Sequence, residues 1–222
     1  MQKLPFEIEE FSPTFKDEFY SLSKTTTYQK STTPFSENEL KNYMFIVLEG
    51  KIKTYRINLE NMREQTFFIY KRGDIFDITT ILDGKSHDVI YEVLEDAKTL
   101  KIPINTVKEW LKNSPEFSQM FYRYISSHIR YLEDLSSDIS LFSVKDRLIN
   151  LLLANLNPDD KLRYNILQNL SNTQIASLLG TVRAVLERAI NDLESKEHIK
   201  TTRKNIQTTS KFIEKYSKML PK

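Results

Sequence analysis

Two arginines in the C-terminal third, Arg183 and Arg188, are the residues whose type and spacing best suit a defined chemistry. A guanidinium group is a planar fork of donors, which can bond guanine O6 and N7 together or can bind phosphate oxygens. Both arginines lie in the segment 182–195, whose apolar periodicity predicts a helix. The chemistry indicated is recognition of a nucleic acid.

Three small or apolar residues around these arginines predict a helix-turn-helix. Ala176 is small where two helices must cross closely, Gly180 lies four positions later at a tight turn, and Leu186 lies six further to fill the core. Ser171 can cap the first helix. The second helix, 182–195, would then present its N-terminal side chains to the major groove of DNA. An ordinary helical hairpin is the alternative interpretation.

The segment 198–207 predicts a short β-hairpin wing with basic residues at its tip, and such cations usually meet phosphates. Glu187 adds a negative charge to the DNA side, where the sequence suggests only a lowered non-specific affinity. The residues expected to contact DNA are Ser171, Asn172, Thr173, Thr181, Val182, Arg183, Ala184, Val185, Glu187, Arg188, Arg203 and Lys204.

The charge distribution agrees with a DNA-binding C-terminal region. The chain has a net charge of +2, but residues 143–222 hold 14 Lys and Arg against 8 Asp and Glu, whereas residues 1–142 hold 18 against 22. A positive domain is attracted to a polyphosphate, because neutralising phosphates releases condensed counterions.

Short runs of alternating apolar and polar residues between Tyr43 and Ile102 predict an antiparallel β-roll or barrel. The expected strands cover 43–48, 51–57, 65–70, 88–93 and 99–102. Gly50, Gly73 and Gly84 fall between them, where turns need positive φ or a close approach of backbones.

A long helix is predicted to follow a short one that begins at Asn105. Its apolar or semi-polar residues recur at steps of four and three, which is typical of a coiled-coil seam, so we expect a dimer interface. The alternative is that the stripe packs on the protein's own sensor domain. The expected interface residues are Phe121, Ile125, His128, Leu132, Leu135, Ile139 and Phe142.

These elements predict an α+β protein with an N-terminal antiparallel β-roll sensor (1–112), a dimerisation helix (113–142) and a C-terminal winged helix-turn-helix (143–222). The sequence has no cysteine, which excludes disulfides, thiol nucleophiles and Cys-ligated clusters. It shows no signal peptide, no run of 18 uncharged apolar residues and no catalytic motif. We therefore expect a cytoplasmic protein that does not contact the membrane and is not an enzyme.

The whole chain resembles the Crp/Fnr family of transcription regulators. The matching residues are Glu49-Gly50, the run Arg72-Gly73-Asp74-Ile75-Phe76, and the segment 143–148 leading into the helix-turn-helix. After the turn, family members commonly have Ser-Arg-Glu-Thr-Val-Ser-Arg, where this chain has the sequence of 182–188. The resemblance implies a dimer that binds duplex DNA at a promoter and works with RNA polymerase.

The two arginines of that stretch match the family pattern, and the other five positions differ. Ala184 replaces a glutamate that would accept from cytosine N4, so another operator is expected, and Ala184 and Val185 could touch thymine methyls. Val182 lacks the hydroxyl that bonds a phosphate, for which Thr181 is a substitute.

The sensor departs from the cyclic-nucleotide-binding members of the family. Their Gly-Glu and Arg-Ser pairs correspond to Asp77-Ile78 and His87-Asp88 here, and a carboxylate and an imidazole hold an anion poorly. We therefore predict no binding of cyclic AMP and no cofactor. A haem-based gas sensor with His87 or His128 as ligand is one alternative, and a β-roll module whose helical tail binds a protein is the other.

Overall fold

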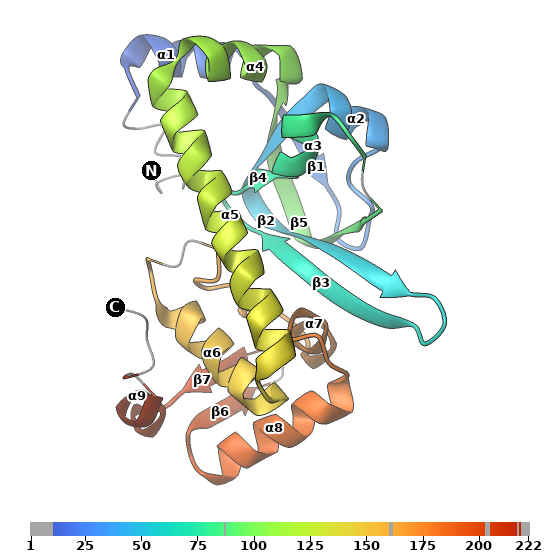
Figure 1. Cartoon of the computed structure of the whole chain (residues 1–222), viewed down its shortest axis with the longest axis vertical. Coiled ribbons are helices and arrows are strands. Elements are labelled where there is room, and N and C mark those ends of the chain that lie inside the picture. Colours follow the sequence, from blue (N-terminus) through green and yellow to red (C-terminus); the bar gives the residue numbers. More distant parts are fainter. Residues whose placement is uncertain (1–10, 87, 160–161, 203–204, 217, 219–222) are drawn as a thin grey trace. The chain divides into compact units, whose positions relative to one another are not determined.

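The computed structural model describes residues 11–86, 88–159, 162–202, 205–216 and 218 (Figure 1). It forms two compact units, one of residues 1–54 with 68–130, the other of residues 55–67 with 131–222. The fold class is as predicted, with an antiparallel β domain, a long helix and a C-terminal helical domain with a two-stranded wing.

The sensor sheet is antiparallel, with strand order β1-β5-β2-β3 and β4 paired to β2. Its strands are β1 (Lys24–Tyr28), β2 (Tyr43–Asn58), β3 (Arg63–Tyr70), β4 (Ile75–Phe76) and β5 (Ile90–Pro103). The helices of the N-terminal half are α1 (Pro13–Leu22), α2 (Glu37–Asn42), α3 (Ile78–Asp83), α4 (Ile104–Asn113) and α5 (Pro115–Leu141).

Gly50 corrects one predicted boundary, because it lies inside the continuous strand β2 and not in a turn between two strands. Its φ is +79°, and a Cβ at this position would lie 2.2 Å from the carbonyl oxygen of Asp96. The glycine therefore permits a close approach between β2 and β5. The predicted strands 88–93 and 99–102 likewise form parts of one strand, β5. Gly73 (φ +84°) lies in a turn as predicted, whereas Gly84 (φ +70°) is the C-cap of α3 and so follows a helix and not a strand.

Two apolar clusters hold the sensor unit together. One joins α1, α4 and the start of α5 to the sheet through Phe19, Trp110 and Phe117, and the rings of Phe19 and Trp110 stack 5.5 Å apart. The other fills the inside of the roll with Phe35, Phe45, Tyr70, Phe76 and Tyr91. Aromatic rings therefore occupy the interior of the β-roll.

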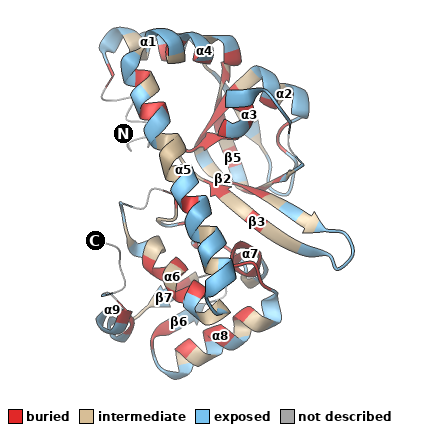
Figure 2. Ribbon diagram, in the orientation of Figure 1, coloured by how far each residue is buried: buried red, intermediate tan, exposed pale blue. Residues whose placement is uncertain are grey.

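The long helix α5 carries both buried and exposed apolar side chains, and two residues of the predicted seam are buried in the single chain. Phe121 (0 % exposed) and His128 (3 % exposed) are buried within the sensor unit, in agreement with the alternative that part of the stripe packs on the sensor. The neighbouring residues Tyr122 and Ile129 are exposed instead, and exposed residues recur along the helix (Figure 2). Of the other predicted seam positions, the exposed ones are Leu132, Ile139 and Phe142, and the half-buried ones are Ile125 and Leu135.

His128 packs against the rings of Phe68, Tyr70 and Tyr124 at centroid distances of 4.9, 6.4 and 4.4 Å. Its Nδ1 bonds the carbonyl oxygen of Tyr124, and its Nε2 is buried without a partner among the described residues. Burial lowers the pKa of His128 from its ordinary value of 6.5 to about 4. The native protein therefore keeps this imidazole neutral where the unfolded chain would protonate it.

We expect acid to destabilise the protein through His128. Between the two pKa values only the unfolded state binds the proton, so stability falls as the pH drops from about 6.5 toward about 4, by about 3 kcal/mol in all. The buried carboxyl of Asp74, whose pKa is raised to about 6 by burial, acts in the opposite sense over this range. The pH dependence of the unfolding free energy must therefore be compared between the wild type and a variant that lacks His128.

Urea unfolding of the wild type and of His128→Leu at about pH 7 and about pH 4.5 isolates this contribution. The wild type should lose about 2 kcal/mol more between the two pH values than the variant does. Equal losses in the two proteins would show that His128 is not held neutral.

The second unit contains α6 (Val144–Leu156), α7 (Asn172–Leu178), α8 (Arg183–Ser195), β6 (Ile199–Thr202), β7 (Asn205–Thr208) and α9 (Ser210–Tyr216). Leu148, Leu186, Leu193 and Phe212 are its fully buried residues at 0 % exposure. Because Leu186 is on α8, burial of this side chain fixes which face of that helix turns inward.

Candidate nucleic-acid interface

The predicted helix-turn-helix is present in α7 and α8. Ser171 caps α7 in a capping box with Gln174, Ala176 is 2 % exposed between the helices, and Leu186 is fully buried. Gly180 has a φ of +63°, which permits the sharp turn at the position where the sequence placed it. The amide of Thr181 donates to the carbonyl of Ala176 at 2.9 Å and closes the turn.

Three polar side chains brace this turn and were not singled out from the sequence. The guanidinium of Arg147, on α6, donates to the carbonyl oxygen of Leu179, and that of Arg63 donates to the carbonyl oxygen of Gly180. The hydroxyl of Ser177 lies 2.7 Å from that of Thr66 and 2.7 Å from a carboxylate oxygen of Glu64. Sequence spacing gave no signal for Arg63 or Ser177, because their contacts join segments more than 100 residues apart.

The exposed surface of α8 begins at its N-terminus. Val182, Arg183, Ala184 and Arg188 are exposed, and the side chain of Arg183 is 63 % exposed. Within the described part of the chain, no hydrogen bond or ion pair holds Arg188. Both guanidinium groups are therefore accessible to a ligand, as the helix-turn-helix prediction requires.

Other predicted contact residues differ in exposure. Ser171 and Thr173 are exposed, and Asn172 and Val185 are half-buried. Thr181 is buried at 8 % exposure, which makes it a poor substitute for the phosphate-binding hydroxyl that Val182 lacks. The wing forms as β6 and β7, with Lys200 exposed, whereas Arg203 and Lys204 lie outside the described residues.

Glu187 interacts with side chains on both helices of the motif. Its carboxylate accepts from Nε of Arg183 at 2.6 Å, one helical turn away. That hydrogen bond is the main cause that lowers the pKa of Glu187, and the side chain of Asn172 on α7 makes a smaller contribution. The acid whose role the sequence left unexplained thus links the recognition helix to its partner helix.

Of the predicted effector residues that the structure describes, two are buried and one is exposed. Asp77 is buried and accepts a hydrogen bond from the hydroxyl of Tyr91 at 3.3 Å, and Ile78 is part of the apolar core. Asp88 is exposed, and His87 lies outside the described residues. The rings of Tyr70, Phe76 and Tyr91 fill the roll beside Asp77.

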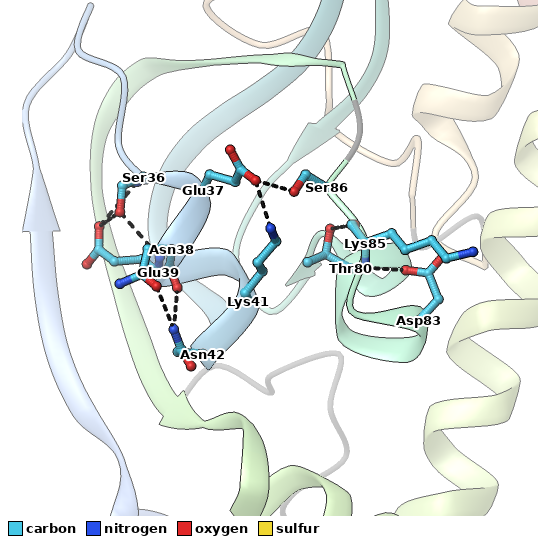
Figure 3. Close-up of polar contacts among 10 residues, drawn as sticks. All are labelled: Ser36, Glu37, Asn38, Glu39, Lys41, Asn42, Thr80, Asp83, Lys85 and Ser86. Carbon is cyan, nitrogen blue, oxygen red and sulfur yellow. Dashed lines mark hydrogen bonds and ion pairs between the residues drawn. The ribbon is translucent and has the colours of Figure 1, made fainter.

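A cavity of about 280 Å³ lies between α2, α3 and the start of β5. Phe35, Leu40, Val89, Ile90 and Tyr91 form its apolar wall, and Thr33, Glu37, Thr80 and Ser86 supply its polar groups. Figure 3 shows the carboxylate of Glu37 between Lys41 and Ser86, which both donate to it. The lining has a carboxylate and, among the described residues, no cation, so it matches a phosphate poorly.

A haem group does not fit the surroundings of His128. Aromatic rings contact the imidazole, and the cavity of the sensor unit is not lined by this residue. Among the described residues, no group of three His, Asp or Glu side chains could hold a metal ion. No helix in the described residues is long and apolar enough to cross a membrane.

Comparison with known proteins gives the same architecture. Residues 25–114 match the cyclic nucleotide-binding domain family. The chain is 25% identical over 185 residues to the global nitrogen regulator of a Nostoc species, covering 80% of this chain and 82% of that protein.

Two solved structures share the fold. One is a CooA mutant from Carboxydothermus hydrogenoformans, with a TM-score of 0.72 at 18% identity, covering 98% of this chain and 97% of the other. The second is a transcriptional regulator of the CRP/FNR family from Thermus thermophilus, with a TM-score of 0.66 at 16% identity, covering 88% of this chain and 98% of the other.

A β-roll, a long helix and a winged helix-turn-helix are the architecture that this chain shares with solved regulators of the CRP/FNR family. In sequence the chain is similar to proteins named as transcription regulators. Its relatives are regulators, so the chain is grouped with them and not with enzymes.

Proposed function

We propose that this protein is a sequence-specific transcription regulator that binds a pseudo-palindromic promoter site as a homodimer and acts on RNA polymerase. The main supporting observation is the exposed N-terminal turn of α8, where Arg183 and Arg188 project from a tightly bent helix-turn-helix. The excess of basic residues in 143–222 adds a general attraction to phosphates.

In this proposal α8 enters the major groove, and its side chains contact different groups of the DNA. Arg183 and Arg188 bind guanine edges or phosphates, and Ala184 and Val185 face thymine methyl groups. Asn172, Thr173 and Lys200 bind the DNA backbone from α7 and the wing. Because Ala184 has no carboxylate, the preferred half-site differs from one read by a glutamate at that position.

The dimer interface we propose is the exposed apolar stripe of α5, formed by Tyr122, Ile129, Leu132 and Ile139, with Ile125 at its edge. These residues recur at steps of three, four and seven, which brings them to one side of a helix. Pairing of two copies along α5 would bury side chains that are 40 to 59 % exposed in one chain. It would also present two recognition helices to one duplex, ~34 Å apart for successive major grooves.

We propose that cyclic AMP is not the effector. Aromatic side chains occupy the inside of the β-roll, and the buried carboxylate of Asp77 lies among them. An anionic phosphate placed there would meet a carboxylate and displace tightly packed rings, both of which are unfavourable. Calorimetric titration with cyclic AMP should therefore give no heat of binding.

Selection of bound duplexes from random or genomic DNA tests the function directly. We expect a two-fold symmetric site, and an affinity for it that falls steeply with salt, with a log–log slope of about −0.9 for each phosphate contacted. A tail that binds only a protein partner would select no sequence. Weak binding that is equal for all duplexes would also contradict the proposal.

A further inference from the structure

Arg183 is the one exposed arginine of α8 that has a charged partner in the described residues. Its Nε donates to Oε1 of Glu187 at 2.6 Å, whereas no hydrogen bond or ion pair within the described residues holds Arg188 on the same helix. The side chain of Asn172, which belongs to the other helix of the motif, also lowers the pKa of Glu187. The Arg183 side chain is therefore held in its position by Glu187.

Glu187 accepts from Nε of Arg183 and from neither terminal nitrogen, and this determines which donors Arg183 can still offer to DNA. A guanidinium has one donor on Nε and four on its two terminal nitrogens. With Nε donated to a carboxylate, both terminal nitrogens stay available, and they form the fork that matches O6 and N7 of guanine. A free arginine must also lose side-chain entropy before it can make that contact.

We propose that Glu187 is a positioning residue that holds Arg183 with its terminal fork toward the major groove, and so sets a preference for guanine at one position of each half-site. This inference rests on the proposed function and names the residue that gives Arg183 its specificity. It explains why a recognition helix carries an acid on the side that faces phosphates. The acid lowers affinity for DNA of any sequence and raises discrimination between sequences.

Two other roles for Glu187 are possible in principle and give different results. Its carboxylate could accept directly from N4 of cytosine, in which case its effect would not depend on Arg183. It could also act only as a negative charge, in which case its removal would strengthen binding to all duplexes equally. A double-mutant cycle separates the three roles, because coupling between residues appears only where they act together.

The experiment measures binding of the selected duplex and of its single-base variants by Glu187→Ala, Arg183→Ala and the double variant. The wild type should prefer guanine at one half-site position by about tenfold or more, in line with ~1–3 kcal/mol for a bidentate contact. Glu187→Ala should reduce that preference to about threefold or less, and the double variant should discriminate no worse than Arg183→Ala alone.

Asp192→Ala provides the matched control. Asp192, near the C-terminal end of α8, forms a pair of the same spacing with Lys196 at 2.6 Å, and it also pairs with Lys145 of α6 at 2.7 Å. Its removal takes away the same charge and should leave the guanine preference unchanged. Glu187→Gln keeps an oxygen that can accept from Nε and should retain part of the preference, which a purely structural or charge effect would not predict.

Two results would overturn the inference while leaving the proposed function intact. One is an unchanged guanine preference in Glu187→Ala, and the other is a further loss of discrimination when Glu187→Ala is added to Arg183→Ala. If the wild-type protein shows no sequence preference, the proposed function itself fails and the inference fails with it. Thermal unfolding of each variant confirms that the comparison is made between folded proteins.

Discussion

Replacing both Arg183 and Arg188 by alanine should lower the affinity for the selected duplex by about 100-fold or more. Each arginine is exposed on α8, and a bidentate arginine–guanine contact contributes ~1–3 kcal/mol of discrimination. If one of the two contacts a phosphate instead, its removal weakens binding to all sequences and reduces the salt slope by about 1. Fluorescence anisotropy over a range of salt concentrations measures both effects.

Arg123→Ala with Arg130→Ala is the matched control, because both are exposed arginines on α5 and not on the recognition helix. The control removes the same formal charge and should change affinity less than threefold or so, as expected for distant charges under screening by salt. Equal losses in the two double variants would mean that general charge, and not α8, is responsible. If the α8 variant binds DNA as tightly as the wild type, the proposal that α8 lies in the major groove is wrong.

The second large effect is expected from Ile129→Glu with Leu132→Glu on the exposed stripe of α5. Ile129 and Leu132 are 54 % and 41 % exposed in a single chain, so two carboxylates there should leave the fold of one chain largely intact. In a paired helix they would face each other in an apolar seam, where buried unpaired charges are strongly unfavourable. The variant should sediment as a monomer.

Loss of the dimer should also weaken DNA binding by about 100-fold or more, because a linked pair of sites gains about that factor from effective concentration. Arg130→Glu with Ser137→Glu adds carboxylates at exposed positions of α5 away from the stripe and should stay dimeric. A dimer that survives Ile129→Glu with Leu132→Glu would move the interface to another surface of the protein.

Local sequence patterns were enough to predict the helix-turn-helix. Ser171, Ala176, Gly180 and Leu186 each perform a role that depends on neighbours within about a dozen positions: a cap, a close crossing, a left-handed turn and a core contact. Such roles can be recognised from residue type and spacing alone. The same reasoning located the wing and the long helix to within a few residues.

Long-range packing decided the features that sequence spacing did not. An apolar period shows that α5 has a buried side, but Phe121 and Tyr122 fit that period almost equally well, and only the packing of the sensor selected Phe121 and His128. The position of Gly50 in the sequence is typical of a turn residue, but in the fold the glycine permits the close approach of the Asp96 carbonyl oxygen. In both cases the partner is far away in sequence, so no local pattern could identify it.

The chain's sequence by itself determined which helix is the candidate for reading DNA and which side chains it offers, because those properties arise within one short segment. Tertiary structure decided how these side chains are held. The contact of Arg183 with Glu187 could be guessed from an interval of four, but the contribution of Asn172 depends on how α7 crosses α8. The filling of the β-roll by Tyr70, Phe76 and Tyr91 likewise depends on three separate segments converging, which is a property of the folded chain alone.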